Sequence, residues 1–327
     1  MSHDGRVARY FGSWSALIDP FERHGADAYA TLCRACAEDP KWGSCDQPLP
    51  ALHAVRLASF SGRATDPFGG DAEAFLRDLD ALGDEVQNAM DLGLVQFTEP
   101  LRLADVIPGL LLASRWAQGR PLRLVELGTS VGLLLAPELF TVHYPHGRWD
   151  PTTALAEMTS DLDVPPTLLA QPLTIADRVG VDLAPVDPRD PGTYDYLRAF
   201  GWPGDDRREQ RLRAALDALC KHPSPVQQGD AVATLPDLLA PDRDVVTVVV
   251  ESALSSYLSG PQALRLGRTL DAFAARTPLM LLTRAAEPEE PVLTSNMTLI
   301  DLSNRRRVKY CLADMLCERT RWVGSAE

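Results

Sequence analysis

The sequence predicts an α/β protein in which a doubly wound, Rossmann-like sheet follows a helical N-terminal region. Up to about residue 118, apolar residues recur at helical spacing. From Pro121 onward, short apolar runs suited to buried strands alternate with helical stretches. This alternation is typical of a parallel sheet that helices cover on both faces. We therefore expect a helical cap at residues 1–118 and a sheet domain at residues 119–327.

Four segments of the N-terminal region have helical periodicity. They are Val7–Leu17, Ala26–Ala37, a segment that begins at Asp71, and Pro100–Trp116. Between them, Ser44–Pro50 and Gly62–Gly70 are rich in Gly, Pro and Asp, which favours connections.

Seven apolar runs after Pro121 are expected to form strands. They span residues 122–127, 178–183, 226–229, 244–251, 278–283, 297–302 and 307–312. Helices lie between them, notably Arg207–Cys220 and Pro261–Ala275, and Arg305–Arg307 marks the turn of a final hairpin. This arrangement resembles the methyltransferase sheet, whose last strand inserts antiparallel. The turn-rich stretch Pro145–Pro166 predicts an insertion near the ligand-binding edge.

A tight glycine turn follows the first predicted strand. Its pattern is Glu126-x-Gly128-x-Ser130-x-Gly132, and residues 133–139 can open a helix behind it. A strand, a glycine turn and a helix N-terminus together expose backbone N–H groups to a ligand. The spacing matches the acidic-x-Gly-x-(Gly/Ala/Ser)-x-Gly loop with which methyltransferases bind adenosylmethionine. The carboxylate of Glu126 disfavours a pyrophosphate and favours a cationic or hydroxyl-rich ligand.

Three other interpretations of this turn compete. The nicotinamide or flavin fingerprint G-x-G-x-x-G fails, because Ser130 and Leu133 stand in place of its second and third glycines. The turn also spells G-x-S-x-G, the nucleophile elbow of a hydrolase, with Ser130 as the nucleophile. That catalytic arrangement needs a histidine late in the chain, and the last 105 residues contain none. A plain strand-to-helix turn is the third interpretation.

Acidic residues follow the second and third predicted strands. Ligands of doubly wound folds bind beyond the carboxyl ends of the strands. There, Asp182 or Asp187 could accept the ribose hydroxyls of an adenosine ligand, and Asp230 with Ala231 could face the adenine amino group. Turn chemistry is the alternative for the first two residues, and a helix N-cap is the alternative for Asp230.

Glu251 ends the fourth predicted strand, which is otherwise rich in valine. Charged residues are rarely buried without a partner, so a carboxylate at this place favours a functional role. In a methyltransferase, the position faces the transferable methyl group. Glu251 could therefore orient an acceptor or act as a general base, and Tyr257 follows it closely in the sequence.

Composition and charge narrow the possible partners. The net charge of −13 argues against nucleic acid. No apolar run approaches the ~20 residues that span a bilayer, and the N-terminus lacks the apolar core of a signal peptide. We therefore expect a cytoplasmic protein with no membrane partner. The spacing of Cys33, Cys36 and Cys45 suggests a zinc site, but a structural zinc site needs four ligands, and the sequence offers no fourth ligand at a suitable spacing. We therefore expect buried, reduced thiols and no bound metal.

Four blocks, in order along the chain, carry a family resemblance. They are Val95-Gln-Phe-Thr-Glu-Pro-Leu-Arg102, Val125–Leu133, Arg178–Asp187 and Leu197–Leu212. Through them, residues 95–323 resemble a family of uncharacterised, largely actinobacterial proteins with a class I methyltransferase-like core. Two departures fall where an acceptor would bind. Glu251-Ser252 stands where members carry histidine followed by serine or threonine, and Thr98 replaces an asparagine.

These patterns predict an S-adenosylmethionine-dependent methyltransferase that acts on a small molecule, with secondary metabolism as one setting. The expected cofactor contacts are Glu126, Gly128, Thr129, Ser130, Gly132, Asp182, Asp230 and Ala231. The expected catalytic residues are Glu251 and Tyr257, and the expected acceptor contacts are Gln96, Glu99, Arg102 and Trp202. The alternatives are a non-methylating relative (a metabolite-binding protein, or a transferase or lyase of other chemistry) and an esterase that uses Ser130. The sequence does not indicate an oligomeric state.

Overall fold

The computed structural model describes residues 12–23, 25–202, 206–286, 295–313 and 320–324. Its described residues divide into two compact units. The helical unit combines the chain up to Thr98 with Asp190–Gln210, and the sheet unit combines Glu99–Arg189 with the chain from Arg211 onward. This division differs from the boundary that we expected at residue 118, because α7 (Arg102–Ala117) packs on the sheet. No helix among the described residues is long and apolar enough to cross a membrane.

The helical unit is built from short amphipathic helices around one apolar core. They are α2 (Trp14–Arg23), α3 (Asp27–Glu38), α4 (Pro48–Ser59), α5 (Ala72–Ala81), α6 (Gly83–Leu92), α9 (Thr193–Arg198) and the start of α10 (Asp206–Lys221), with the 3₁₀ turn η1 (Pro67–Gly69). The helices predicted at 26–37 and from Asp71 are confirmed, and Asp71 caps α5 by accepting from the Ala74 N–H. The helix predicted at 7–17 is displaced toward 14–23, and residues 7–11 lie outside the described residues.

Helix α4 starts earlier than predicted, and α3 holds two of the cysteines. The connection predicted at Ser44–Pro50 ends early, because α4 begins at Pro48 and the first turn of a helix tolerates proline. Cys33 and Cys36 lie on the buried face of α3, and burial raises the pKa of both thiols, that of Cys36 to about 12. Within the described residues, no group of three or more His, Cys, Asp or Glu side chains is placed to hold a metal ion.

The sheet unit contains one large sheet, whose strand order in the described residues is β11-β10-β9-β8-β7-β1-β5-β6. The strands are β1 (Leu122–Leu127), β5 (Ile175–Asp182), β6 (Val226–Gln228), β7 (Val246–Ser252), β8 (Leu279–Ala286), β9 (Ser295–Asp301), β10 (Arg306–Ala313) and β11 (Thr320–Trp322). Strands β6, β5, β1, β7 and β8 are neighbours in this order and run parallel to one another. Strands β9, β10 and β11 each run antiparallel to the strand before them in the chain. All seven predicted strands are present, and β11 was not predicted.

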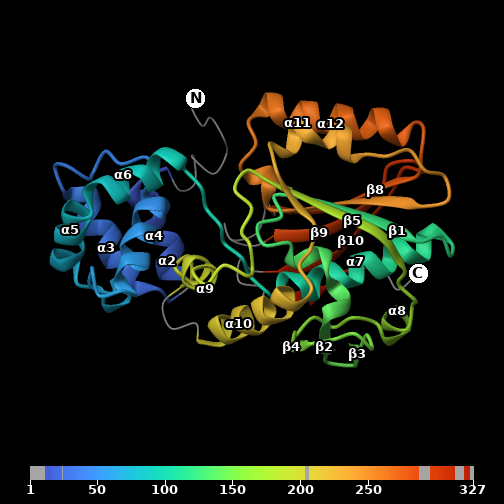
Figure 1. The fold of residues 1–327 in the computed structure, drawn as a ribbon, viewed down its shortest axis with the longest axis horizontal. Helices are drawn as coiled ribbons and strands as arrows, with labels where there is room; N and C mark the ends of the chain where they lie inside the picture. Colours follow the sequence, from blue (N-terminus) through green and yellow to red (C-terminus); the bar gives the residue numbers. More distant parts are fainter. Residues whose placement is uncertain (1–11, 24, 203–205, 287–294, 314–319, 325–327) are drawn as a thin grey trace. The chain divides into compact units, whose positions relative to one another are not determined.

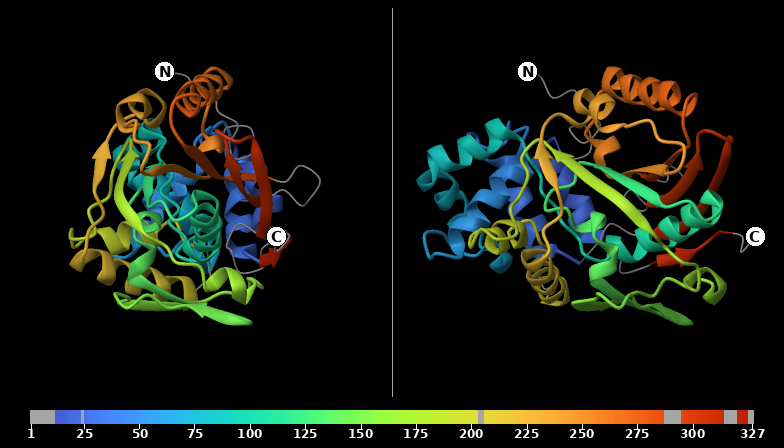
Figure 2. Two further views of the ribbon diagram at one scale, coloured as in Figure 1. Left: turned by 90° about the vertical axis from the view of Figure 1, so that its right-hand side faces the viewer. Right: turned by 45° about the vertical axis from the view of Figure 1, so that its right-hand side comes forward.

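Helices cover both faces of this sheet, which makes the fold a doubly wound α/β fold as predicted. Helices α11 (Ala231–Leu238) and α12 (Gly260–Ala274) lie on one face, and α7 lies on the other (Figures 1 and 2). After β1, the chain places β5 and β6 on one side of that strand, and it then places β7 and β8 on the other side. The direction in which strands are added therefore reverses between β1 and β7, and ligands of open α/β sheets bind at such a reversal of the strand order.

The last strands do not insert as expected. β9 lies directly beside β8, and β10 follows on its outer side. Only eight residues separate Ala286 from Ser295. A parallel crossover needs a dozen residues or more, so β9 can only turn back antiparallel against β8. The predicted hairpin turn between β9 and β10 is confirmed, with Arg305 at φ +56°.

The helix expected at residues 133–139 is absent. Two 3₁₀ turns, η2 (Leu133–Leu135) and η3 (Pro137–Leu139), stand in its place, because Pro137 lacks the N–H that an α-helix would need there. The chain then forms a small sheet of order β3-β2-β4, followed by α8 (Pro166–Leu169). Its strands are β2 (Phe140–Tyr144), β3 (Gly147–Trp149) and β4 (Ala156–Thr159). These elements form the insertion that the turn-rich sequence predicted.

Two tyrosine hydroxyls hold helix α7 in place within the sheet unit, next to a proline inside the helix. Pro108 lies inside the helix and cannot donate to the carbonyl of Ala104. The hydroxyl of Tyr144 donates to that carbonyl at 2.8 Å, and the hydroxyl of Tyr310 donates to the carbonyl of Asp105 at 2.7 Å. Gly109 makes the second approach possible, since a Cβ there would clash with the Tyr310 hydroxyl. These contacts hold the first turns of α7 in place.

Candidate functional site

The carboxyl ends of β5, β1 and β7 meet at the reversal of the strand order. We call the residues that follow these strands, with those that follow β6, the carboxyl edge: 126–132, 182–187, 229–231 and 251–257. Parallel strands bring these segments to the same side of the sheet, although up to 125 positions separate them in the sequence. The cofactor contacts predicted from the sequence all lie on this edge.

Glu126 is buried at the end of β1, with only 3% of its surface exposed. Thr129 donates to its Oε2 atom at 2.5 Å. Gly180 on β5 makes room for Thr129, because a Cβ at that glycine would lie 2.6 Å from the Thr129 methyl group. Burial raises the pKa of Glu126 to about 8, and the Thr129 hydrogen bond and the nearby Arg102 oppose this rise. The raised pKa favours the neutral form of the Glu126 carboxyl group at pH 7.

The glycine turn has a left-handed backbone at three positions. Gly128, Ser130 and Gly132 have φ of +72°, +52° and +79°. A Cβ at Gly132 would lie 2.7 Å from the Cβ of Ser224, so this glycine allows close packing against the segment that enters β6. A Cβ at Gly128 would meet Leu254 at 3.5 Å, an ordinary contact. The left-handed backbone would strain any residue with a Cβ at either position, and Leu254 covers the space outside Gly128.

Asp182 and Asp187 have different surroundings. Asp182 is buried at the end of β5, where its carboxylate accepts from the N–H of Ser130 at 2.8 Å and from that of Ala184 at 2.9 Å. It thereby joins the glycine turn to the segment after β5. Asp187 is exposed and pairs with Arg189, whose guanidinium and N–H lower the pKa of that carboxyl. Only Asp182 lies against the glycine turn.

Three further residues of the carboxyl edge lie in segments next to Asp182, namely Leu183, Asp230 and Ala231. Asp230 caps α11, and its Oδ1 atom accepts from the N–H groups of Val232 and Ala233 at 2.9 Å, which confirms the N-cap interpretation. Ala231, the next residue, is buried in the first turn. Leu183 is 56% exposed directly after Asp182. Our sequence reasoning missed Leu183, because a single apolar residue in a Pro-rich loop carries no periodic signal.

Both carboxylate oxygens of Glu251 are engaged. Oε1 accepts from the N–H of Ser255 at 2.6 Å, and Oε2 accepts from the hydroxyl of Thr283 on β8 at 2.6 Å. The residue is 3% exposed, and burial raises its pKa. Tyr257 lies just beyond the 3₁₀ turn η4 (Leu254–Ser256) and is 41% exposed. Glu251 thus faces into the protein, and Tyr257 is open to solvent.

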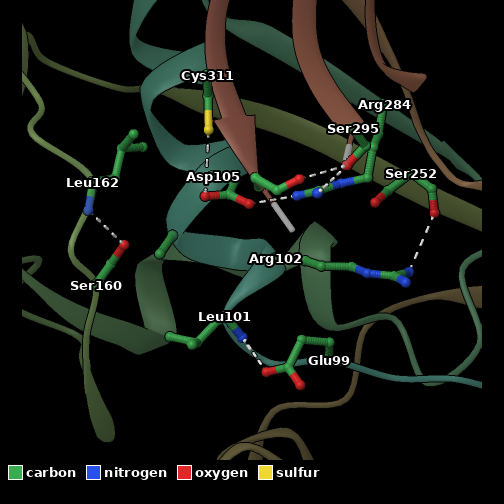
Figure 3. Close-up of polar contacts among 12 residues, drawn as sticks. Glu99, Leu101, Arg102, Asp105, Ser160, Leu162, Ser252, Arg284, Ser295 and Cys311 are labelled. Atoms are coloured by element: carbon green, nitrogen blue, oxygen red, sulfur yellow. Dashed lines mark hydrogen bonds and ion pairs between the residues drawn. The ribbon is translucent and has the colours of Figure 1, made fainter. Parts of the chain in front are cut away.

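A buried ion pair lies next to the carboxyl edge, and the sequence reasoning missed it. Asp105 on α7 pairs with Arg284 on β8, and Arg284 also donates to Ser295 Oγ at 2.9 Å (Figure 3). The thiol of Cys311 lies 3.7 Å from Asp105 Oδ1. A usable signal existed, since Asp105 interrupts the apolar face of a strongly periodic helix. Burial of an aspartate in that face requires a cationic partner.

The expected acceptor contacts are divided between the two units. In the sheet unit, Arg102 donates to the carbonyl of Ser252 at 3.4 Å, and buried Glu99 accepts from the N–H of Leu101 at 3.0 Å (Figure 3). Gln96 and Trp202 belong to the helical unit. Trp202 packs there against the ring of Phe21, with ring centroids 4.9 Å apart. The environment of Trp202 is therefore that of a core residue.

The comparisons with known proteins identify the family. A family model described as "Uncharacterized protein conserved in bacteria (DUF2332)" matches residues 21–322. The chain belongs to this family. The match spans the whole carboxyl edge, and the family's description states no activity. A search of curated proteins finds no match.

Solved structures show only distant likeness. WbdD in complex with the kinase inhibitor LY294002 is 17% identical, over 58% of this chain and 30% of that one, with a TM-score of 0.29. The same protein at 2.2 Å gives 16% identity and the same coverage. The sugar N-methyltransferase KedS8 from Streptoalloteichus sp ATCC 53650 is 14% identical over 68% and 71% of the two chains, with a TM-score of 0.24. The chain thus spans less than a third of the length of WbdD. The doubly wound α/β fold follows from the strand order of the sheet and not from these similarities.

Proposed function

We propose that this member of the family is a methyltransferase that uses S-adenosylmethionine to methylate a small molecule. The observation that carries the proposal is the placement of Asp182 beside the glycine turn, at the reversal of the strand order. Glu126 ends the adjacent strand, and Asp230 follows the next one. A small-molecule partner and a cytoplasmic location are parts of this proposal, as is membership of a largely actinobacterial subset of the bacterial family.

The residues of the carboxyl edge fit the cofactor at its adenosine end. Asp182 accepts from the N–H groups of Ser130 and Ala184, so its carboxylate lies at the turn where ribose hydroxyls would need an acceptor. Leu183, exposed beside it, offers an apolar surface for a purine ring. Glu126 would ionise next to the cationic amino-acid end. The fit departs from expectation at Gly128, where Leu254 occupies the approach.

The cofactor, when bound, supplies an electrophilic methyl group. The chain's own contribution is to bind and orient the two reactants, which is the largest part of catalysis for an in-line displacement. Tyr257 and Arg102 are the candidate acceptor contacts in the sheet unit, because Tyr257 is exposed at the carboxyl edge and Arg102 binds the end of β7. Glu251 lies at the same strand end, where we expected a base or an acceptor contact.

Calorimetric titration with S-adenosylmethionine and S-adenosylhomocysteine tests the proposal. We expect both to bind the folded wild type, and we expect Asp182→Asn to weaken binding at least tenfold. Absence of binding by folded wild-type protein would overturn the proposal. The exposed Asp187→Asn variant is the matched control and should bind as the wild type does.

One structural observation favours a second candidate, a non-methylating relative that binds or converts another metabolite. Leu254 covers Gly128, and Glu251 stands where the resembling proteins carry histidine. Native mass spectrometry of protein purified without added cofactor separates the two candidates, because a co-purifying ligand without an adenosyl group favours the second. The Ser130 esterase is disfavoured, because the last 105 residues of the sequence contain no histidine.

A further inference from the structure

The segment Ser252–Tyr257, which we call the strap, connects β7 to α12 and passes over the glycine turn. Its Leu254 side chain lies where a Cβ on Gly128 would point, with Leu254 Cδ1 at 3.5 Å and Cβ at 3.6 Å from that position. The far end of the strap is anchored by the capping box of α12, in which Ser259 and Gln262 satisfy each other's backbone N–H groups. The strap is therefore held at its end and covers the turn at its middle.

The strap adopts a conformation that is not favourable by itself. Ala253 has φ +90° and ψ −8°, a left-handed conformation that a residue with a Cβ rarely adopts. Such a conformation is unfavourable and persists only where its surroundings hold it. Contacts elsewhere must therefore outweigh this strain for the strap to stay closed.

Glu251 supplies the contact in the middle of the strap. Its Oε1 atom accepts from the Ser255 N–H at 2.6 Å, four residues before the Ser259 cap of α12, and its Oε2 atom accepts from the Thr283 hydroxyl at 2.6 Å. Arg102 adds a weaker contact, at 3.4 Å, to the carbonyl of Ser252 (Figure 3). The carboxylate thus joins the strap to β8 through one side chain.

We propose that Glu251 is a positioning residue that holds the strap closed over Gly128, and that a ligand enters the glycine turn by displacing Leu254. The identity of that ligand rests on the proposed function, whereas the closure by Glu251 does not. The strap would then regulate access to the same site, and the carboxylate would act through the strap rather than on the acceptor.

Hydrogen–deuterium exchange of residues 252–257 in the free protein tests the closure without any ligand. Glu251→Gln keeps an oxygen for the Ser255 N–H and an amide that can donate to Thr283, so exchange should stay within about threefold of wild type. Glu251→Ala removes both contacts, and exchange should rise tenfold or more. Thr283→Val removes only the second partner and should give an intermediate rise. Glu157→Ala, on the small sheet, is the control and should leave the strap unchanged.

Three results would overturn the closure. They are unchanged exchange in both Glu251→Ala and Thr283→Val, a rise in Glu251→Gln as large as in Glu251→Ala, or an unchanged strap in Thr283→Val if Glu251→Ala does not fold. Turnover, rather than exchange, tests a general base. Glu251→Gln would then lose turnover although the exchange of its strap matches the wild type, because Gln cannot replace the proton-accepting carboxylate.

The displacement is tested with S-adenosylmethionine and Leu254→Ala. We expect the smaller side chain to raise affinity about tenfold, and we expect the cofactor to increase exchange of the strap in the wild type. If the cofactor binds with equal or lower affinity to Leu254→Ala and leaves strap exchange unchanged, Leu254 is not a gate, and the proposed function stands. If S-adenosylmethionine binds neither the wild type nor Leu254→Ala, the proposed function is wrong, and this cofactor does not enter by displacing Leu254. The exchange measurements test the closure of the strap by Glu251 independently of this result.

Discussion

Glu126 and Glu251 end neighbouring strands, yet their side chains leave opposite faces of the sheet. In the register of β1 and β7, Leu127 pairs with Glu251, one position beyond Glu126. Leu127 and Val249 pack in the core beneath α11 and α12, and side chains alternate along a strand. Glu251 therefore points toward that face, whereas Glu126 points toward α7 and feels the charge of Arg102. The two carboxylates do not form an acid–base pair, and each needs a separate test.

Replacing Glu126 with Gln should change how stability depends on pH. Because burial raises the pKa of Glu126 from 4.5 to about 8, the native protein keeps a proton that the unfolded chain loses between these values. The contribution of Glu126 is full below pH 4.5 and is lost as the pH rises through 8, by at most about 1.4 kcal/mol per pH unit. Urea unfolding of wild type and Glu126→Gln between pH 4.5 and 8.5 measures this. Parallel pH profiles for the two proteins would contradict the shifted pKa.

Asp182 should matter for stability as well as for ligand binding. Asparagine at this position has one carbonyl oxygen for two backbone N–H donors, so Asp182→Asn should cost about 1–3 kcal/mol in the free energy of unfolding. Asp187→Asn should change it by less than about 0.5 kcal/mol, because that residue is exposed. Chemical denaturation of both variants checks the contrast. Equal effects would mean that Asp182 does not join the two segments as described.

The two glycines of the turn should differ in their tolerance of alanine. At Gly128, the left-handed backbone alone opposes a Cβ, at about 1–2 kcal/mol. At Gly132, the same strain adds to a clash with Ser224, and overpacking costs a further 1–3 kcal/mol or so. Gly267→Ala, in α12 where a Cβ meets nothing within 4 Å, is the control and should stabilise the protein by about 0.5–1 kcal/mol. Thermal unfolding of the three variants gives the order, and a Gly128→Ala cost above that of Gly132→Ala would refute it.

The buried Asp105–Arg284 pair should be far more costly to break than a surface pair. Asp105→Ala leaves the guanidinium of Arg284 buried without its carboxylate, which typically costs about 3–5 kcal/mol. The control is Glu85→Ala, which breaks an exposed pair with Arg63 and should cost less than about 1 kcal/mol. Urea unfolding measures both. Similar costs for the two variants would show that solvent reaches the buried pair.

Local periodicity made part of the fold predictable. The period of the apolar residues identified the strands and the main helices, because alternation and helical spacing depend only on local geometry. The antiparallel return of β9 was not predicted, because the strands expected at 278–283 and 297–302 leave 13 residues between them, enough for a crossover, whereas β8 and β9 leave eight. The small sheet was visible only as a turn-rich stretch, because its strands are short and partly polar.

The candidate site was predictable at the level of strand ends and not at the level of contacts. That Glu126, Asp182 and Glu251 share one edge follows from parallel strands that end after apolar runs. The sequence did not predict that Asp182 holds the glycine turn and that Asp187 pairs with Arg189. Both are acidic residues in the same proline-rich stretch, so no local pattern separates them. Their difference depends on which backbone N–H groups the folded chain brings within reach.

Local sequence patterns were enough to predict the α/β class, the glycine turn after the first strand and the acidic residues that end the strands, since each depends on residues close together in the chain. The contacts of those residues became known only from the folded protein. Arg284 meets Asp105 across 179 positions, and Leu254 covers Gly128 from the other side of the strand-order reversal. Such contacts depend on packing and burial between distant segments. No local pattern of side chains specifies them, because a buried charge or an open glycine can be satisfied by any segment that the fold brings near.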